Sequence, residues 1–198
     1  MSKNHYNKVR FLMGAHEIRQ LPEDSGTEIA IAGRSNAGKS SVLNVITGNS
    51  KLARISKTPG RTQQMNIFVV DDERRLVDLP GYGYAKVPVA MRKHWGSTLN
   101  RYFQKRRALS GLVLIMDIRH PLKPGDQQML DWSCQVGLPT HILLNKSDKL
   151  SRGAGMSLLQ QMKRRMNDDL ISIQLFSALK RTGAEEVREV LDRWFEYH

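Results

Sequence analysis

One short string near the start of the chain constrains its fold more than any other feature. It reads Gly33-Arg34-Ser35-Asn36-Ala37-Gly38-Lys39-Ser40 and matches the pattern G-x-x-x-x-G-K-[ST]. An apolar run at 28–32 precedes it, and a helical pattern at 39–46 follows it. A loop in that setting turns backbone N–H groups and the positive end of a helix dipole toward phosphate oxygens. A chance glycine-containing turn is the alternative, and the flanking strand and helix make it the less favoured one.

The residue types within this loop suit a triphosphate and a hard cation. Gly33 and Gly38 are expected to leave room where a Cβ would block the approach of phosphate. Lys39 is expected to reach the β- and γ-phosphates as a point charge. The Ser40 hydroxyl is expected to ligate Mg²⁺, which prefers oxygen ligands.

Apolar runs alternate with helical patterns along the rest of the chain, which predicts the α/β class with a mostly parallel sheet and helices on both faces. We expect strands at 28–32, 65–70, 74–79, 112–117, 141–145 and 171–176. Helical patterns fall at 39–46, 89–107, 127–136, 156–166 and 184–195. A length of 198 residues predicts one domain over 1–198, with residues 1–22 as an N-terminal extension packed on it. Residues 49–63 form an expected long loop, and such loops are usually functional.

The charge balance favours a polyanionic partner. Lys and Arg number 31 against 19 Asp and Glu, which gives a formal net charge of +12. The single cysteine, Cys134, excludes a disulfide framework and favours a reducing compartment. It is expected in the core on an apolar helix face. Charges throughout the first thirty residues argue against a signal peptide, and the apolar run at 112–116 is too short to span a membrane, so we expect a soluble, cytoplasmic chain.

A second motif places a carboxylate at the end of another strand. Asp78-Leu79-Pro80-Gly81 ends the expected strand at 74–79, and open α/β sheets bind ligands at that edge. Asp78 can hold Mg²⁺ directly or through water. Gly81 can offer its N–H to a γ-phosphate, so that loss of this phosphate would release the following segment.

A third motif points to guanine. Asn145-Lys146-Ser147-Asp148 follows the apolar strand at 141–145. The Asp148 carboxylate can accept hydrogen bonds from the ring N–H and the exocyclic amine of guanine, a pair that adenine lacks. Asn145 would tie the loop and the base together, while the Lys146 stem would cover the face of the base. In isolation the same string could be a polar turn at a strand end.

A fourth segment completes an ordered set. Ser177, Ala178 and Leu179 follow the last expected strand, where backbone N–H groups could contact the guanine carbonyl oxygen. The order of these four motifs along the chain is that of a Ras-like P-loop GTPase domain.

Three further strings narrow the resemblance. Lys57-Thr58-Pro59-Gly60-Arg61-Thr62-Gln63, Asp78-Leu79-Pro80-Gly81-Tyr82-Gly83-Tyr84 and Asp117-Ile118-Arg119-His120-Pro121 resemble the bacterial EngB (YihA/YsxC) GTP-binding proteins. The resemblance spans essentially the whole chain, and that family belongs to the Era/EngA/TrmE-like GTPases. It implies a GTPase that acts in assembly of the large ribosomal subunit, contacts its rRNA, and is needed for normal cell division and septation. It also implies a monomer that binds GTP or GDP with Mg²⁺.

The resemblance also assigns roles that the residues alone leave open. It makes 57–63 the first switch segment and Thr62 its metal ligand, whereas sequence chemistry does not choose Thr62 over Thr58. The metal set is then Ser40, Thr62 and Asp78, and the catalytic set is Lys39, Thr62 and Gly81. The nucleotide set adds Gly60, Arg61, Gln63 and Gln64 to the four motifs.

The hydrolytic machinery departs from the Ras-like template at one position. Tyr82 stands where a water-orienting glutamine would follow Gly81, so slow intrinsic hydrolysis is expected. Asn36 occupies the loop position where an asparagine helps to coordinate K⁺ in some related GTPases. We hypothesise that K⁺ or a bound ribosomal partner supplies the missing charge in the transition state.

Residues 86–116 contain no acid and carry a run of cations, namely Lys86, Arg92, Lys93, Arg101, Lys105, Arg106 and Arg107. A single-sign run favours contact with an RNA backbone, and a solvated helix face is the alternative. Met91, Trp95, Leu99 and Tyr102 recur at helical spacing and are expected to face the core. Lys163, Arg164 and Arg165 either extend the basic surface or form a solvated face.

Two other functions compete with a GTPase. A nucleotide kinase would share the phosphate loop but would not need the string at 145–148. An RNA-binding module with a vestigial nucleotide site would not need Lys39, Ser40, Asp78 and Asp148 to be intact.

Overall fold

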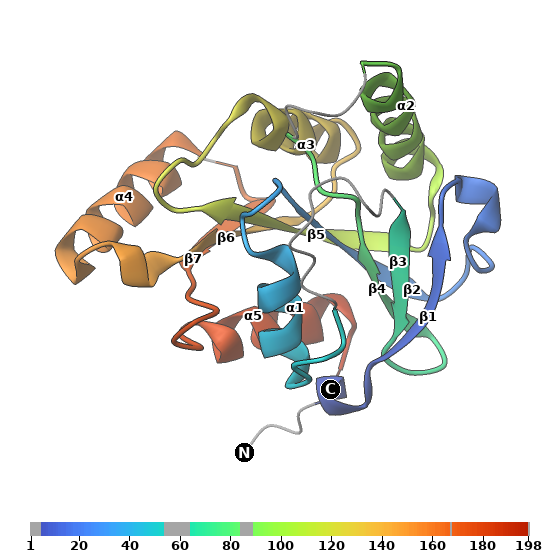
Figure 1. Ribbon diagram of the computed structural model, residues 1–198, viewed down its shortest axis with the longest axis horizontal. Coiled ribbons are helices and arrows are strands. Elements are labelled where there is room, and N and C mark those ends of the chain that lie inside the picture. The colour runs from blue at the N-terminus through green and yellow to red at the C-terminus, as the bar shows by residue number, and fades with distance from the viewer. Residues whose placement is uncertain (1–4, 54–63, 84–88, 167, 198) are drawn as a thin grey trace.

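The computed structural model describes residues 5–53, 64–83, 89–166 and 168–197 of the chain (Figure 1). In this part of the chain, one sheet has the strand order β1-β3-β4-β2-β5-β6-β7. The strands are β1 (Arg10–Ala15), β2 (Thr27–Gly33), β3 (Met65–Val69), β4 (Arg74–Asp78), β5 (Leu109–Asp117), β6 (Thr140–Asn145) and β7 (Ile171–Leu175). The helices are α1 (Lys39–Thr47), α2 (Val89–Lys105), α3 (Pro124–Gln135), α4 (Arg152–Arg165) and α5 (Ala184–Trp194). Three short 3-10 helices join them, η1 (His5–Lys8), η2 (Ile18–Gln20) and η3 (Ser147–Lys149).

The sheet is mostly parallel, which brings the predicted motifs to one edge. β4, β2, β5, β6 and β7 run parallel to one another, whereas β3 is antiparallel to both β1 and β4. The carboxyl ends of the five parallel strands therefore meet at the same edge. The α/β class with a mostly parallel sheet is confirmed.

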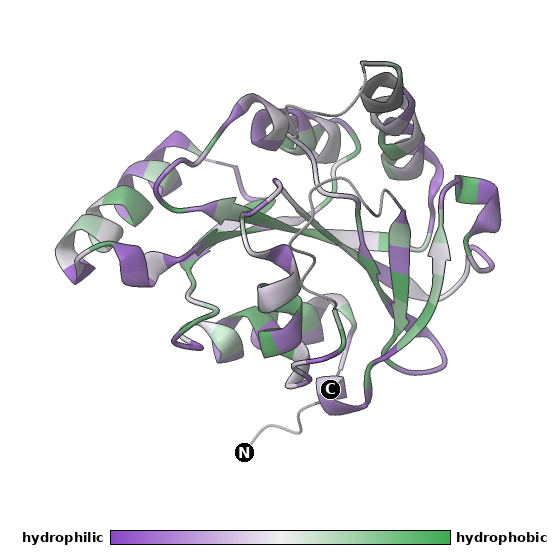
Figure 2. Ribbon diagram, in the orientation of Figure 1, coloured by the Kyte–Doolittle hydropathy of each residue, from purple (hydrophilic) through white to green (hydrophobic). Residues whose placement is uncertain are grey.

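Helices cover both faces of the sheet. Side chains of α1 and α5 pack into one apolar cluster with Ile29 and Ile31 of β2. Side chains of α2, α3 and α4 pack into a second cluster on the opposite face, with Ala30 and Ala32 of the same strand. Figure 2 shows the central strands as predominantly hydrophobic, whereas the helices carry both hydrophilic and hydrophobic residues. Alternate residues of one strand thus supply two cores, as expected for a strand buried on both faces.

Three elements start three or four residues earlier than the sequence predicts. β5 begins at Leu109, α3 at Pro124 and α4 at Arg152. Pro124 occupies the first turn of its helix, where a missing N–H costs nothing, and Asp126 accepts from the backbone N–H of Lys123 at 2.9 Å. The Ser151 side chain caps α4 by accepting from the N–H of Ala154. The first turn of each helix is set by capping residues rather than by apolar spacing. A prediction from apolar periodicity therefore starts both helices too late in the sequence.

The strand β1 was not predicted. Phe11 and Leu12 are exposed at 51% and 42%, and the pairing with β3 shifts register between Phe11 and Met13. An edge strand with a bulge lacks the alternation by which buried strands are found. β1 lies within the expected N-terminal extension at 1–22 and pairs with β3 at the edge of the sheet.

The two ends of the described chain meet. His5 stacks on Tyr197 with ring centroids 3.9 Å apart, and the Tyr6 hydroxyl donates to Asp192 Oδ1 at 2.6 Å. η1 also packs against α1, with Asn7 lying against Gly48 at the carboxyl end of that helix. The ends therefore lie a helix length away from the loop that begins α1.

Two core predictions have different outcomes. Leu99 and Tyr102 of α2 are buried and Trp95 is partly buried, which confirms the predicted core face; the side chain of Met91 lies outside the described residues. Cys134 was predicted in the core and is exposed instead. The adjacent Ser133 is buried and donates to the carbonyl of Leu130 at 2.9 Å, so the helix phase is one residue away from the prediction. In the part of the chain that the structure covers, no helix is long and apolar enough to cross a membrane.

Candidate functional site: a nucleotide-binding edge

The loop at 33–40 joins β2 to α1 as predicted. Gly33 ends β2, and a Cβ there would lie 2.9 Å from the carbonyl oxygen of Ile115, so close packing against β5 requires a glycine. Ala37 N–H donates to the carbonyl of Arg34 at 3.0 Å, and Asn36 between them has φ +65°. Asparagine tolerates this left-handed conformation better than most residues. The backbone thus folds back on itself just before α1 begins.

Gly38 has two reasons to be a glycine. Its φ is +96°, a left-handed value that L side chains rarely adopt. A Cβ built on Gly38 would also overlap Nδ2 of Asn145. That nitrogen donates to the carbonyl of Ala37 at 2.8 Å. The sequence predicted clearance for phosphate here, and the structure adds clearance for the guanine-side motif.

Lys39 and Asp78 form an ion pair at the start of α1 and the end of β4. Lys39 Nζ donates to Asp78 Oδ1, and both side chains are largely buried. Asn66 of β3 donates from Nδ2 to the other carboxylate oxygen, Oδ2, at 3.3 Å. Gln64 in turn donates from Nε2 to Asn66 Oδ1 at 3.0 Å. The lysine predicted to bind phosphates and the aspartate predicted to bind a metal are therefore neighbours.

Residues around Asp78 supply oxygen donors of the kind that Mg²⁺ prefers. Ser40 lies in the first turn of α1, and Asp78 ends β4 beside Lys39. Among the described residues, no group of three or more His, Cys, Asp or Glu side chains is arranged to hold a metal ion. One hydroxyl and one carboxylate suit Mg²⁺, which keeps waters and substrate phosphates as its other ligands. Thr62, the third predicted ligand, lies outside the described residues, as do Gly60, Arg61 and Gln63.

Asn145 joins three loops. Besides its bond to Ala37, its Oδ1 accepts from the N–H of Ala178 at 3.1 Å. Asn145 ends β6 and is buried, while Ala178 follows β7. The phosphate loop, the loop after β6 and the loop after β7 are thus held together by one side chain amide.

Lys146 is positioned by its backbone and by two acceptors. It has φ +66° and is the N-cap residue of η3. Its Nζ donates to the carbonyl of Asn36 at 2.6 Å and to Asp117 Oδ2 at 2.9 Å. Hydrogen bonds from Arg119, together with Lys146, hold the pKa of the Asp117 carboxyl well below its usual range. The two hydrogen bonds from Nζ hold the end of the Lys146 side chain against the phosphate loop and Asp117, so that its stem can cover a base.

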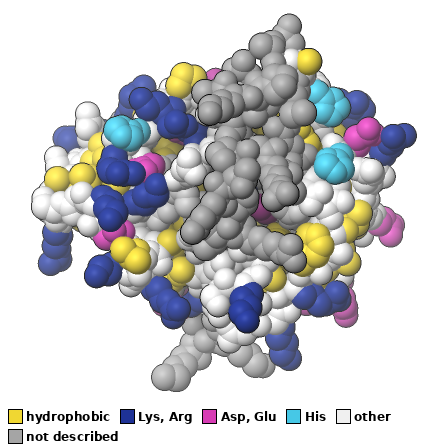
Figure 3. Space-filling model, viewed as in Figure 1, with side chains coloured by type: hydrophobic (Ala, Val, Ile, Leu, Met, Phe, Trp, Pro, Cys, Tyr) yellow, Lys and Arg dark blue, Asp and Glu magenta, His cyan; other side chains and the backbone are white. Residues whose placement is uncertain are grey.

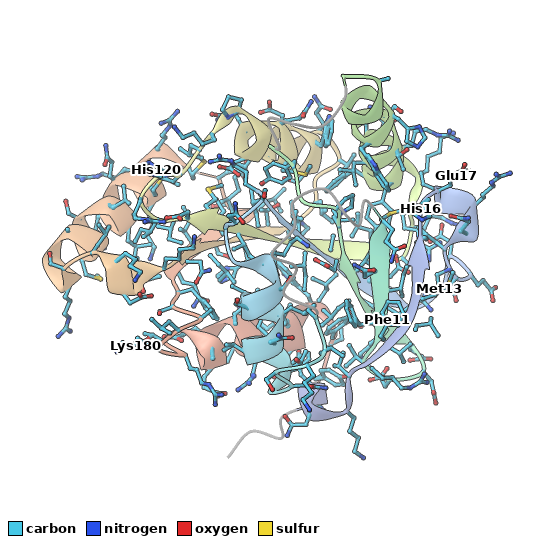
Figure 4. All side chains as sticks on the ribbon, in the orientation of Figure 1. Phe11, Met13, His16, Glu17, His120 and Lys180 are labelled. Atoms are coloured by element: carbon cyan, nitrogen blue, oxygen red, sulfur yellow. The ribbon has the colours of Figure 1, made fainter. Side chains whose placement is uncertain are left out.

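Asp148 and Ser177 close the opposite side. Ser177 Oγ donates to Asp148 Oδ1 at 2.5 Å, and Ser147 N–H donates to the carbonyl of Phe176 at 3.0 Å. Leu179 is 72% exposed at the rim. Figure 4 labels His120 and Lys180 on the two loops that flank this part of the edge. A cavity of about 770 Å³ opens here, with Gly38, Asn145, Asp148 and Ala178 in its lining.

Tyr82 is anchored to α3 through its side chain and to the phosphate loop through its backbone. Leu79 is buried, Pro80 and Gly81 follow it, and the Tyr82 hydroxyl donates to Asp126 Oδ1 of α3 at 2.7 Å. Burial and the nearby Asp126 carboxylate raise the pKa of Tyr82 well above its ordinary value. The Tyr82 carbonyl accepts from Ser35 N–H at 2.9 Å, and a Cβ on Gly125 would overlap the Tyr82 ring. Tyr82 thus connects the phosphate loop to the first turn of α3.

The basic stretch at 86–116 divides into three kinds of residue. Arg101 and Lys105 of α2 are exposed. Arg106, which the sequence grouped with them, is buried and donates to both carboxylate oxygens of Glu28, at 2.9 and 2.6 Å, so it is not available to a partner. Lys86 and the side chains of Arg92 and Lys93 lie outside the described residues. Sequence spacing could not find the Glu28 pairing because 78 residues separate the partners.

Two polar residues of this edge were missed by the sequence analysis. Asn66 was missed because a single polar residue in the apolar run at 65–70 carries no motif. Asp126 was missed because its partner Tyr82 lies 44 residues away. The usable signal for Asn66 was its position in a strand whose other residues are apolar.

Comparison with known proteins is in keeping with this geometry. Residues 28–146 match the family model described as a 50S ribosome-binding GTPase. The chain is 54% identical over 190 residues to a probable GTP-binding protein EngB of Stenotrophomonas maltophilia, which covers 94% of this chain and 95% of the relative. It is 52% identical over 192 residues to the same-named protein of Coxiella burnetii, covering 96% and 94%.

Solved structures share the fold. A crystal structure of a probable GTP-binding protein EngB superposes with a TM-score of 0.70 at 19% identity, covering 87% of this chain and all of the other. Era in complex with MgGDPNP and nucleotides 1506–1542 of 16S ribosomal RNA superposes with a TM-score of 0.65 at 21% identity, covering 86% and 57%. The fold is that of a Ras-like P-loop GTPase, and the chain belongs to the EngB family of GTP-binding proteins.

Proposed function

We propose that this GTPase is a nucleotide-dependent assembly factor for the large ribosomal subunit, acting in the cytoplasm and needed for normal cell division and septation. GTP serves as a timer: the GTP-bound form docks on rRNA, and hydrolysis ends the contact. The description of the matching family model and the RNA-bound Era structure support a ribosomal partner. In this proposal, GTP binds and is hydrolysed at the nucleotide-binding edge described above.

The observation that carries the RNA contact is the difference in charge between helices α2 and α4 on one face of the sheet and helix α5 on the other. α2 and α4, on one face, contain no acidic residue. α5, on the other face, contains Glu185, Glu186, Glu189 and Asp192. Figure 3 shows many Lys and Arg side chains on the side of the molecule where α4 lies. A polyanion is therefore attracted to α2 and α4, whereas α3 carries Asp126 and Asp131 without a Lys or Arg, and α5 has four acids against Arg188 and Arg193.

Mg²⁺, when bound with the nucleotide, neutralises charge on the phosphates. Ser40 and Asp78 would hold it together with Thr62, while Lys39 would turn from Asp78 to the phosphates. Asp148 and Asn145 would select guanine, and the N–H of Gly81 would meet the γ-phosphate. A K⁺ ion at Asn36 stays a prediction.

Slow intrinsic hydrolysis is part of the proposal. The hydroxyl of Tyr82 donates to Asp126 and so is not free to orient an attacking water. An activating contact would therefore come from outside the described residues, from K⁺ or from the ribosomal partner.

Sedimentation with ribosomal particles tests the proposal. The chain is incubated with large subunits in GDP, GTP or a non-hydrolysable GTP analogue, over a salt series. We expect most binding with the analogue, and weakening as salt rises, because phosphate contacts release counterions. Reversing Arg101 and Lys105 to Glu should weaken binding at low salt. The matched control reverses Lys8 and Arg193, exposed cations on the α1 and α5 side.

Sedimentation that is the same with every nucleotide would contradict the role of GTP as a timer. Sedimentation that does not change with salt would contradict the contacts with RNA phosphates. Equal competition by ATP and GTP would instead favour a nucleotide kinase. RNA binding with no measurable GTP affinity would favour a vestigial site.

A further inference from the structure

Three strands place a row of residues beside the predicted metal carboxylate. Gly14 of β1 pairs with Asn66 of β3, and Asn66 pairs with Asp78 of β4. Residues directly opposite in antiparallel strands point to the same face of the sheet. That face is the one covered by α1, which supplies Lys39. The row therefore runs from the outer edge of the sheet to the phosphate loop.

Both oxygens of Asp78 are engaged, but by partners of different kinds. Lys39 holds Oδ1, and Asn66 donates to Oδ2 at 3.3 Å. Lys39 is needed by phosphates when nucleotide is present, whereas Asn66 has no such second task. An aspartate χ2 torsion is broad, so a carboxylate released by Lys39 would turn freely without another donor. Asn66 is the group placed to prevent this.

The orientation of the Asn66 amide is itself fixed. Gln64 Nε2 donates to Asn66 Oδ1 at 3.0 Å, which turns the Asn66 NH₂ group toward Asp78. The reverse orientation would set the amide oxygen against the carboxylate and leave Gln64 without its acceptor. Gln64 therefore acts on Asp78 through Asn66.

Gly14 supports this arrangement by lacking a side chain. A Cβ built on Gly14 would overlap the Gln64 amide group, so Gln64 rests directly on the backbone of β1. The φ of Gly14 lies outside the left-handed region, so alanine can adopt the same backbone there. A methyl group at position 14 would thus push Gln64 without straining the strand.

We propose that Gln64 and Asn66 are positioning residues that keep the Asp78 carboxylate oriented for the Mg²⁺ it would hold, and that Gly14 of the edge strand supports them. The inference rests on the proposed function, because that function supplies the ion. It assigns a role in metal binding to β1, an edge strand that pairs with β3.

The test separates metal affinity from nucleotide affinity. Binding of a fluorescent GDP analogue is measured in EDTA and across a Mg²⁺ titration for the wild type, Asn66→Ala and Gly14→Ala, the last of which displaces Gln64 without replacing it. We expect EDTA affinities within about twofold of wild type, and an Mg²⁺ midpoint raised about tenfold by Asn66→Ala. Gly14→Ala should raise the midpoint about two- to threefold in the same direction.

Gly153→Ala is the matched control, because a Cβ there meets nothing within 4 Å. If the GDP affinity of the wild type does not depend on Mg²⁺, both the metal site and the positioning role of Gln64 and Asn66 are wrong. If it does depend on Mg²⁺ but the Mg²⁺ midpoint of Asn66→Ala equals that of the wild type, only the positioning role is wrong. A fall in EDTA affinity as large as the fall in Mg²⁺ would show that Asn66 acts on the fold, and would also overturn it. Gly14→Ala gives the same decisions should Asn66→Ala not fold.

Discussion

The two halves of the nucleotide-binding edge are built differently. In the base half, Asn145, Lys146 and Asp148 are each tied to a neighbouring loop, through Ala37, Asn36 and Ser177. In the phosphate half, Lys39 and Asp78 are tied to each other. The side chains of the base half are already held in place to bind guanine. In the phosphate half, Lys39 has to leave Asp78 before it can bind phosphates.

This difference separates selection from switching. A preorganised base half binds guanine with little ordering cost, and this favours affinity and selectivity in every nucleotide state. A phosphate half that satisfies its own charges has two alternative sets of partners, and this is what a two-state element requires. We expect substitutions in the base half to affect GDP and GTP alike.

The largest effect should follow from Asp148→Ala. Loss of the carboxylate leaves the guanine N–H groups without an acceptor, and affinity for GTP should fall by about two orders of magnitude. Calorimetric titration should show that GTP no longer outcompetes ATP, while the GDP-to-GTP affinity ratio stays as in wild type. Lys163→Ala is the control, since Lys163 is an exposed cation of α4 that does not line the cavity. An unchanged preference for GTP over ATP would refute the base assignment.

A smaller effect should follow from Asp117→Ala. Lys146 would keep its bond to Asn36 and lose the one to Asp117, so that its stem covers the base less firmly. Nucleotide affinity should fall about three- to tenfold, equally for GDP and GTP. Asp131→Ala, which removes an exposed acid on α3, serves as the control. A loss confined to GTP would show that the two halves are not separable in this way.

The smallest effect concerns pH. The pKa of Asp117 is lowered in the folded chain, first by the hydrogen bond from Arg119. A lowered carboxyl pKa stabilises the fold above the unfolded pKa, and this stabilisation is lost as pH falls through the folded pKa. Arg119 is 44% exposed, so the contribution should be below about 1 kcal/mol. The difference in unfolding free energy between wild type and Asp117→Asn should therefore shrink on acidification, as measured by denaturant titration; a constant difference would contradict it.

The sequence predicted those parts of the molecule that local patterns determine. The buried strands at 28–32 and 141–145 were found because both their faces are apolar, and the loop at 33–40 because its motif is contiguous. β1 was missed because an exposed, bulged edge strand has no such pattern. Cys134 was placed wrongly because one residue of helix phase decides between core and solvent.

What escaped prediction in the site depends on tertiary register. Asn66 reaches Asp78 only because β3 and β4 pair in one particular register, and Arg106 is buried only because Glu28 lies beneath it. Neither relation leaves a trace in local spacing. The predicted ligand Thr62 lies outside the described residues, so its role stays a prediction.

The meeting of the two chain ends has a practical consequence. His5 and Tyr197 lie together near the carboxyl end of α1, far from the loop at its beginning. A reporter joined near His5 or Tyr197 would therefore lie at the carboxyl end of α1, a helix length from the phosphate loop. Proximity labelling from it would map what surrounds that part of the docked protein.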